Sequence, residues 1–233
     1  VTPSHQFPTG TIMSISRRTE LLNWANENFN CYIIEDDYDS EFKYTGRPIP
    51  ALKANDINDK VIYLGSFSKS ISPAIRVSYL VLPKELLNIY QKKLPYFICP
   101  VPTLNQKILY RFIKDGYFVK HINKMRTLYK KKREFLVNTI KKYSSEILNK
   151  EIYIQGADAG LHLVIKLNQK INEKAFLKEC LENSLQLYSL EEYYLEETYN
   201  ETSSFLLGYA NLTNNEIDEG ILLLLRILKK YYI

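Results

Sequence analysis

A lysine between two strand-like segments has the setting most suggestive of chemistry in this sequence. The stretch VIYLGSFSKSISPAIRVSYLVL runs from Val61 to Leu82, and Lys69 lies in its middle among small hydroxyl residues. Arg76 follows seven positions later. A lysine on a loop at the end of a strand can bond covalently to an aldehyde, whereas a lysine that only solubilises a surface needs no such setting. Lys69 is therefore a candidate catalytic residue.

An acidic segment follows another strand-like segment earlier in the chain, where CYIIE (31–35) leads into DDYDSEF. Open α/β folds bind ligands at the ends of such strands. Pyridoxal phosphate requires a lysine for its aldehyde, a carboxylate beside its pyridine nitrogen, and hydroxyl and guanidinium donors for its phosphate. The sequence offers all three in Lys69, an aspartate of EDDYD, Ser66, Ser68 and Arg76.

Each part of this pattern also has a simpler interpretation. Ser-x-Ser-Lys is a common loop, Arg76 could form a structural ion pair, and EDDYD could be a solvated turn or a magnesium site. The three histidines share no ligand spacing with EDDYD, which weakens the metal hypothesis. Only the joint order is specific: a strand, an acidic segment, a second strand about 30 residues on, then the lysine and the arginine.

Composition restricts the class of protein. The chain has 233 residues, of which 45% are hydrophobic and 24% charged, so we expect a folded, soluble protein with a real core. The net charge of +5 is mild, and the basic residues between Lys114 and Lys142 are interpreted as a solvated helix face. Three scattered cysteines fit a reducing cytoplasm. No apolar run approaches the ~18 residues of a membrane span.

Periodicity predicts alternating helices and strands in the first part of the chain. RRTELLNWANENF predicts a helix with Leu21, Leu22, Ala25 and Phe29 on one side. The continuous apolar runs VIYL and VSYLVL predict strands that are buried on both faces. A long helical stretch from Thr103 to about Tyr143 follows, with a break expected at Gly116.

The last part of the chain predicts a smaller set of elements. LHLVIKL (161–167) alternates as a strand with one covered face, a helix follows over about 173–184, and FLLGYA predicts a second strand. Thr213 and Glu216 have the spacing of a capping box at the start of the final helix. The expected organisation is α/β: residues 1–100 in part of a large domain, 101–143 as a connecting helical segment, and 144–233 as a small α+β domain.

Five segments, in order, resemble the fold-type-I pyridoxal-phosphate proteins, the aspartate aminotransferase superfamily. More closely, they are similar to the aminotransferase-like domain of MocR-type regulators, a branch of the GntR transcription factors. The matching segments are VTPSHQFPTGTIM, YIIEDDYDSEFKY, GSFSKSISPAIRVSYLVLP, AGLHLVI and LLGYANL. HQFPTG together with EDDYDSEF is typical of the regulators. The resemblance implies a large mixed-sheet domain followed by a small α+β domain.

The resemblance also implies a role for each candidate residue. Lys69 would form the Schiff base, and Asp36, two positions before the tyrosine, would pair with the pyridine nitrogen in preference to Asp37. Tyr38 would bond the ring hydroxyl. The phosphate would be held by Ser66, Ser68 and Arg76, and the loop at the ring hydroxyl edge would contain His5 and Gln6. Phe7 replaces the asparagine that aminotransferases have there, which leaves this last contact in question.

One departure from the family pattern bears on activity. Aminotransferases hold the substrate carboxylate with an arginine on the last small-domain strand, and the alignment of YANLT places Leu206 at that position. We therefore expect a PLP-binding, effector-sensing domain with at most weak transaminase activity. The alternative is a PLP-dependent aminotransferase acting on amino acids. Tyr193 and Tyr194 lie where some regulators carry an effector-binding arginine.

The regulator resemblance implies further partners. It predicts a homodimer, a small amine or PLP itself as effector, and DNA binding through an N-terminal winged helix. It also implies that the winged helix and the first half of the large domain precede Val1, outside this chain. A cytoplasmic protein without membrane contact is expected.

Overall fold

The computed structural model describes residues 1–46, 49–195 and 201–232. Its contacts divide the chain into two compact units. Unit 1 comprises Val1–Gln6 and Ile12–Arg126, and unit 2 comprises Phe7–Thr11 and Thr127–Ile233. The chain therefore leaves unit 1 after Gln6 and returns to it at Ile12. The boundaries expected near residues 100 and 143 stay predictions.

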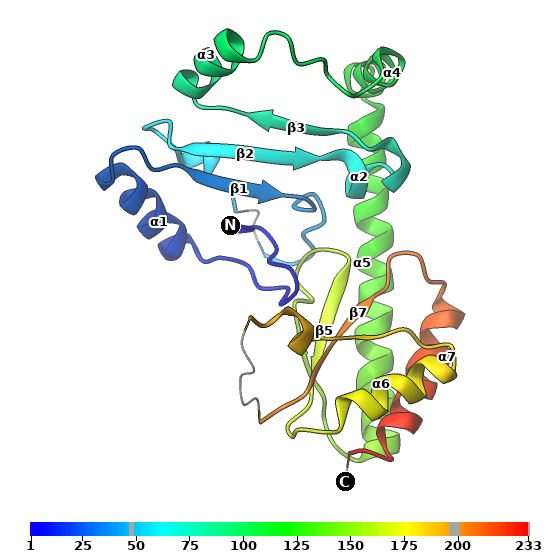
Figure 1. Cartoon of the computed structure of the whole chain (residues 1–233). Coiled ribbons are helices and arrows are strands. Elements are labelled where there is room, and N and C mark those ends of the chain that lie inside the picture. The colour runs from blue at the N-terminus through cyan, green and yellow to red at the C-terminus, as the bar shows by residue number, and fades with distance from the viewer. Residues whose placement is uncertain (47–48, 196–200, 233) are drawn as a thin grey trace. The chain divides into compact units, whose positions relative to one another are not determined.

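Unit 1 contains a three-stranded mixed sheet in the order β1-β2-β3 (Figure 1). β1 and β2 are parallel, and β3 runs antiparallel to β2. The sheet strands are β1 (Ile33–Asp37), β2 (Val61–Ser66) and β3 (Ser78–Val81). The helices are α1 (Ile15–Glu27), α2 (Phe67–Ser70), α3 (Lys84–Lys93) and α4 (Thr103–Lys114). The mixed pairing agrees with the predicted fold class.

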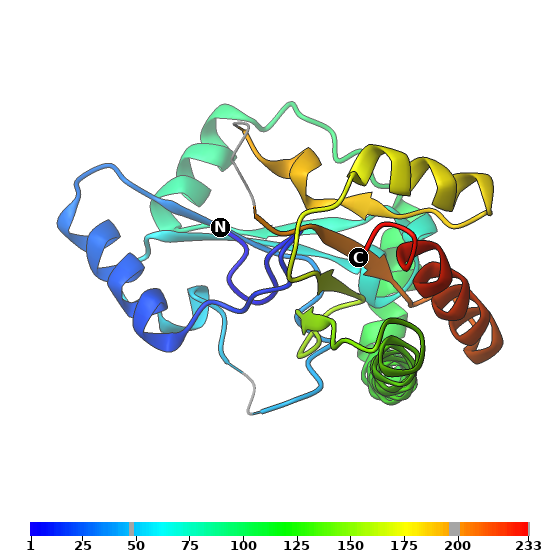
Figure 2. The same ribbon diagram turned by 90° about the horizontal axis from the view of Figure 1, so that it is seen from below.

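Helices α1 and α3 lie on opposite sides of this sheet (Figure 2). α1 begins after Ser14, whose side chain accepts a hydrogen bond from the backbone of Arg17, and it packs through Ala25 against Ile33 and Val61. Leu21 and Leu22 adjoin this core as predicted. The prediction for Phe29 was wrong: α1 ends at Glu27, and Phe29 is 90% exposed.

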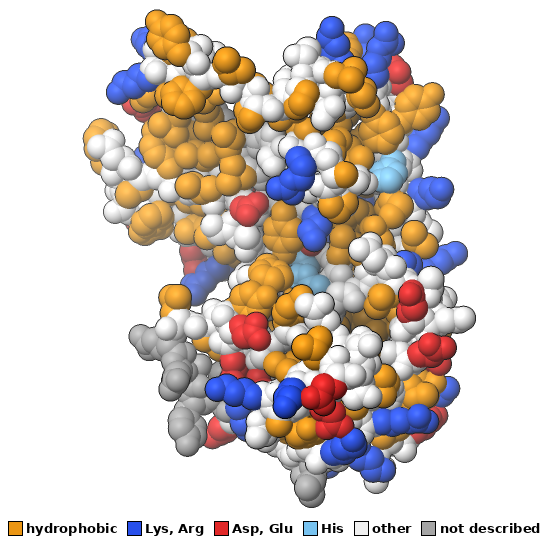
Figure 3. Space-filling view, turned by 45° about the vertical axis from the view of Figure 1, so that its right-hand side comes forward, with side chains coloured by type: hydrophobic (Ala, Val, Ile, Leu, Met, Phe, Trp, Pro, Cys, Tyr) orange, Lys and Arg blue, Asp and Glu red, His pale blue; other side chains and the backbone are white. Residues whose placement is uncertain are grey.

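The second face of the sheet carries exposed apolar side chains. Ile34 on β1 and Leu80 on β3 are 53% and 54% exposed, and all four residues of β3 are exposed. Hydrophobic side chains gather on this part of the surface (Figure 3). The prediction of strands buried on both faces was therefore wrong for β3, because among the described residues no element covers this face fully.

Gly116 breaks the long helical stretch, as predicted. Its φ of +77° lies in the left-handed region that favours glycine, and it separates α4 from α5 (Tyr117–Tyr143). α5 begins in unit 1 and continues into unit 2, since the boundary falls between Arg126 and Thr127. None of the helices in the described part of the chain is long and apolar enough to cross a membrane.

Unit 2 contains a four-stranded antiparallel sheet in the order β4-β5-β7-β6. Its strands are β4 (Tyr153–Gln155), β5 (His162–Lys166), β6 (Tyr188–Ser189) and β7 (Ser204–Gly208). Its helices are the second part of α5, α6 (Glu173–Glu182) and α7 (Asn214–Leu228). Helices α6 and α7 and the two longer strands, β5 and β7, fall where periodicity predicted them.

The core of unit 2 lies between this sheet and its helices. Leu163 and Ile165 of β5 and Phe205 of β7 are at most 1% exposed and pack in one cluster with Phe176 of α6. The expectation of a half-covered β5 was wrong, since Val164 on the opposite face is also only 1% exposed. α7 begins with the predicted capping box: the Thr213 side chain accepts from the Glu216 backbone, and the Glu216 side chain accepts from the Thr213 backbone.

Candidate functional site

Lys69 lies on a single helical turn that begins where β2 ends. Ser66 caps this turn, since its Oγ accepts a hydrogen bond from the Ser68 backbone at 3.2 Å. The segment that was expected to be a loop is therefore a short helix, because serine is a preferred N-cap residue and Ser66 caps this turn. Ser70 is buried, whereas the Lys69 side chain is exposed. The amine of Lys69 is thus presented at the surface of unit 1 on a fixed turn.

Close packing beside this turn explains the glycine at the end of β2. A Cβ on Gly65 would lie 2.2 Å from the Tyr79 ring of β3, so any other residue would require that ring to move. The Phe67 ring lies 5.3 Å from that of Tyr79 and 5.8 Å from that of Phe118 on α5. These aromatic contacts fix the start of α2, and with it the position of Lys69.

The segment after α2 folds back and brings Arg76 into the same loop. Ser72 caps a short 3-10 turn (Pro73–Ile75), and the backbone of Phe67 donates to the carbonyl of Val77 at 3.0 Å. Arg76 has φ +49° and ψ +39°, a left-handed conformation that costs a residue other than glycine about 1–2 kcal/mol. Such local strain is frequent at functional sites. The structure thus places Arg76 in one segment with Ser66, Ser68 and Lys69, and the Phe67–Val77 backbone hydrogen bond closes that segment.

Asp36 and Asp37 lie within β1, although the sequence suggested that the acidic residues follow the strand. They point to opposite faces of the sheet. Asp37 is buried and accepts a hydrogen bond from the Tyr63 hydroxyl at 2.8 Å, whereas Asp36 is exposed. Asp36 pairs with Leu64 of β2, so it shares a face with Ser66 two residues further along that strand. The exposed carboxylate is therefore the one expected to meet a ligand.

His5 and Tyr38 meet beside the end of β1. The Tyr38 hydroxyl donates to the His5 carbonyl at 2.8 Å and lies 3.4 Å from His5 Nδ1. His5 Nδ1 also lies 2.8 Å from Asp39 Oδ2, and both side chains of this pair are buried. Burial raises the pKa of the Tyr38 hydroxyl above its usual value, with the nearby aspartates adding to the effect. Tyr38 is therefore held neutral and can act as a hydrogen-bond donor.

Sequence reasoning missed Asp39 as part of this group. Burial raises the pKa of Asp39, while the hydrogen bond from His5 and the positive charge of Lys69 act in the opposite direction. The electrostatic effect of Lys69 on this carboxyl shows that the turn carrying Lys69 is near the end of β1. Asp39 itself was visible in the sequence as the third aspartate of EDDYD, but its pairing with His5 was not.

Unit 2 contributes an aromatic group around Phe7. The Phe7 ring meets the rings of His162 and Tyr193 edge to face, with centroid distances of 5.5 and 5.2 Å. Gln155 Nε2 donates to the Thr9 carbonyl at 2.9 Å and so holds the same segment on β4. Gln6, the residue before Phe7, is half-buried and belongs to unit 1.

Leu206 lies in the middle of the small sheet, where it pairs with Val164 of β5 and Tyr188 of β6. The next arginine along the chain, Arg226, is exposed on α7. Among the described residues, no group of three histidine, cysteine, aspartate or glutamate side chains could hold a metal ion. The magnesium hypothesis for EDDYD therefore has no structural support in that part of the chain.

Comparison with known proteins identifies the family of this fold. The family model described as aminotransferase class I and II matches residues 1–222, so the chain belongs to this family. Within it, the chain matches the aminotransferase-like domain of MocR-type regulators.

Several curated relatives are HTH-type transcriptional regulators, and another, aromatic-amino-acid aminotransferase 1 of Thermococcus litoralis, is 26% identical over 98% of this chain and 53% of that protein. The chain is 43% identical over 220 residues to the uncharacterized HTH-type transcriptional regulator YhdI of Bacillus subtilis, covering 94% of this chain and 45% of that protein. It is 30% identical to the probable rhizopine catabolism regulatory protein MocR of Rhizobium meliloti, covering 95% of this chain and 43% of that protein. The chain thus spans about half the length of the curated relatives it matches.

Solved structures show the same fold. The kynurenine aminotransferase of Pyrococcus horikoshii, crystallised with PMP, superposes with a TM-score of 0.84 at 26% identity, covering 99% of this chain and 55% of that one. The predicted fold-type-I class is therefore confirmed.

The donor set of unit 1 fits pyridoxal phosphate. The exposed amine of Lys69 suits its aldehyde, and the exposed carboxylate of Asp36 suits its pyridine nitrogen. The loop that carries two serines and Arg76 suits its phosphate. The opposite charges of Lys69 and Asp39 are also near enough to interact.

Proposed function

We propose that this chain is the PLP-binding, effector-sensing and dimerising domain of a MocR-type transcriptional regulator. The observation that carries this proposal is Leu206. An apolar side chain in the row between Val164 and Tyr188 cannot form the bidentate contact that an arginine makes with a substrate carboxylate. The similarity to HTH-type regulators over nearly the whole chain supports the same function.

The residues of unit 1 would each hold one part of the cofactor. Ser66, Ser68 and Arg76 would donate to the phosphate, and Asp36 would keep the pyridine nitrogen protonated, because a nearby negative charge favours the cationic form. Lys69 would supply the amine that bonds the aldehyde. When bound, pyridoxal phosphate supplies an aldehyde that exchanges amines and a ring that accepts electrons.

The ring hydroxyl would be recognised by Tyr38 with His5 and Gln6 beside it. The His5 carbonyl accepts from the Tyr38 hydroxyl, and the buried Asp39 holds the His5 ring. Asp39 is therefore a positioning residue for Tyr38 in this proposal.

The wider regulator is part of the same proposal. It would form a homodimer in the cytoplasm, since symmetric dimers are the commonest oligomers. It would bind DNA through an N-terminal winged helix, and a small amine or PLP would shift the dimer between two states of different DNA affinity.

Two measurements on one sample of the full-length regulator test this function: a coupled transamination assay and a DNA-binding titration with and without PLP and amines. We expect very slow turnover, because loss of a bidentate carboxylate contact costs a few kcal/mol and each ~1.4 kcal/mol is a factor of ten in rate. DNA affinity should change with the ligand. Turnover of several per second, with DNA affinity indifferent to PLP and amines, would instead establish the aminotransferase alternative.

A further inference from the structure

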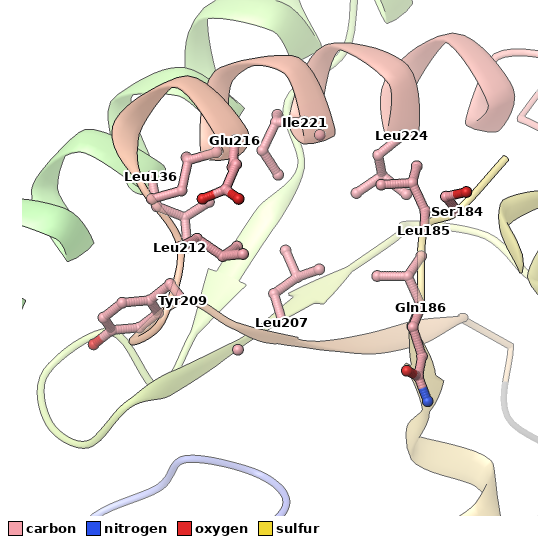
Figure 4. Close-up of a pocket in the computed structure, with 14 residues that line it drawn as sticks. Leu136, Ser184, Leu185, Gln186, Leu207, Tyr209, Leu212, Glu216, Ile221 and Leu224 are labelled. Atoms are coloured by element: carbon pink, nitrogen blue, oxygen red, sulfur yellow. The ribbon is translucent and has the colours of Figure 1, made fainter.

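An apolar cavity lies in unit 2 between α7, β7 and the segment that joins α6 to β6 (Figure 4). Its volume is about 420 Å³, within the range of about 300–1,000 Å³ typical of ligand pockets. Leu136, Leu185, Leu207, Ile221 and Leu224 are among its walls. None of the residues proposed to hold pyridoxal phosphate lines it. The cavity is thus separate from the donor set of unit 1.

Two glycines, Gly208 and Gly220, are among the residues that line this space. A Cβ on Gly220, inside α7, would meet only Leu185 Cδ2 at 3.8 Å, which is ordinary contact, and a Cβ on Gly208 would meet nothing within 4 Å. Neither glycine has a positive φ, so the backbone requires glycine at neither position. Glycine is among the least favourable residues inside a helix, so Gly220 weakens α7 without a packing reason. An alanine at position 220 would therefore fit without a clash.

The cavity has one charged group among its lining residues, the carboxylate of Glu216. Figure 4 shows this carboxylate near the side chains of Leu212 and Leu136. Its Oε2 accepts from the Thr213 backbone at 2.7 Å and from the Thr213 hydroxyl at 2.8 Å. These hydrogen bonds hold the pKa of Glu216 below its usual value, so it is ionised at neutral pH.

The positive charge of Lys132 also lowers the pKa of Glu216. Lys132 Nζ donates to the Ala210 carbonyl at 2.8 Å, and Lys132 does not line the cavity. Among the described residues that line the cavity, Glu216 alone carries a formal charge, and its side chain is exposed to solvent. A ligand with a cationic end gains electrostatic energy there, whereas a ligand with a carboxylate is repelled.

We propose that this cavity binds a small amphiphilic amine, with its apolar body among the leucine and isoleucine side chains and its ammonium group at Glu216. The apolar walls bury the hydrocarbon part and supply the affinity. The carboxylate supplies the selectivity for a cation. The site is a second ligand site in unit 2, and it does not depend on cofactor binding in unit 1.

Calorimetric titration of the intact protein with n-octylamine tests the site directly, with octan-1-ol and octanoate as probes of equal chain length. We expect saturable binding of octylamine, weaker binding of octanol, and at least tenfold weaker binding of octanoate. Absence of saturable octylamine binding, or equal affinity for octanoate, would overturn the proposal.

Two variants locate the binding. Gly220→Leu places a side chain in the cavity and should weaken octylamine binding at least tenfold, whereas the matched Gly220→Ala should bind as the wild type does. Glu216→Gln keeps a side chain that can complete the capping box and should bind octylamine no better than octanol, even if Gly220→Leu does not fold. Unchanged octylamine affinity in a folded Gly220→Leu variant, or in Glu216→Gln, would show that the amine binds elsewhere.

Discussion

Among the residues that the structure describes, unit 2 has a cluster of twenty buried residues that join its sheet to three helices, whereas the corresponding cluster in unit 1 has four. Both units bury polar side chains: those of unit 1 are mostly ionisable, among them His5, Arg18, Glu35 and Asp37, whereas those of unit 2 are mostly hydroxyls. The Arg18 guanidinium donates to three backbone carbonyls, those of Pro3, Met13 and Pro50. Unit 2 is therefore stabilised mainly by apolar packing, and unit 1 depends more on specific hydrogen bonds.

This difference matches the distribution of the candidate chemistry. Every residue proposed to hold the cofactor lies in unit 1, in and around a sheet whose second face carries exposed Ile34 and Leu80. Buried hydrogen bonds fix side chains in defined positions, as a binding site requires. In this chain, which spans about half the length of its curated relatives, the unit that carries the proposed site has the smaller apolar cluster.

The largest contrast should appear when the same side chain is deleted in the two units. Phe176 is fully buried in unit 2 and its ring lies 5.0 Å from that of Phe205, whereas Phe29 in unit 1 is 90% exposed. Phe176→Ala should lower the free energy of unfolding by about 3–5 kcal/mol. Phe29→Ala should change it by less than about 0.5 kcal/mol. Chemical denaturation measures both, and similar losses in the two variants would refute the contrast.

A buried carboxylate should matter next most. Glu35 is fully buried and accepts from the backbones of Leu52 and Lys53 at 2.8 and 2.9 Å. Glu35→Ala leaves both amides without an acceptor, and we expect a loss of about 2–4 kcal/mol, since each unsatisfied buried group costs about 1–3 kcal/mol. Glu35→Gln keeps one acceptor oxygen and should lose less. Equal losses, measured in urea, would mean that these hydrogen bonds contribute little.

A smaller effect should appear in the pH dependence of unit 1. Burial raises the pKa of Glu41 to about 7 from its usual 4.5, and the neighbouring Asp37 and Asp39 add to the shift. Folding therefore takes up a proton between these values, and the free energy of unfolding falls as the pH rises from about 4.5 to about 7.

Glu41→Gln removes this contribution and tests the sign. The variant should equal the wild type near pH 4 and be more stable by about 3 kcal/mol near pH 8, because one pKa unit corresponds to about 1.4 kcal/mol. Glu27→Gln, at the exposed end of α1, is the matched control and should leave the pH dependence unchanged. A variant less stable than the wild type at pH 8 would show that the Glu41 charge is favourable in the folded protein.

Local patterns in the sequence predicted several features correctly. The break at Gly116 and the capping box of Thr213 and Glu216 depend on residues close in the chain, so their chemistry is visible in the sequence. The fold class was also predictable, because the motifs resembling a known family extend through nearly the whole chain.

Features that depend on tertiary pairing were not predictable. Phe29 follows the helical period but lies beyond the end of α1, and β3 is apolar although exposed. The burial of Asp39 against His5 joins residues 34 positions apart, and no local pattern specifies that contact. The α3 helix and the short β4 and β6 strands were missed, since short elements are selected by packing more than by propensity.

Reductive labelling of the full-length regulator tests whether Lys69 is the residue that bonds the cofactor. The full-length regulator is incubated with pyridoxal phosphate, reduced with borohydride and digested, and the labelled lysine is identified by mass spectrometry. We expect the label on Lys69. In Lys69→Ala, both the label and the visible absorption of the bound cofactor should be lost. Stoichiometric label on another lysine, retained in Lys69→Ala, would contradict it.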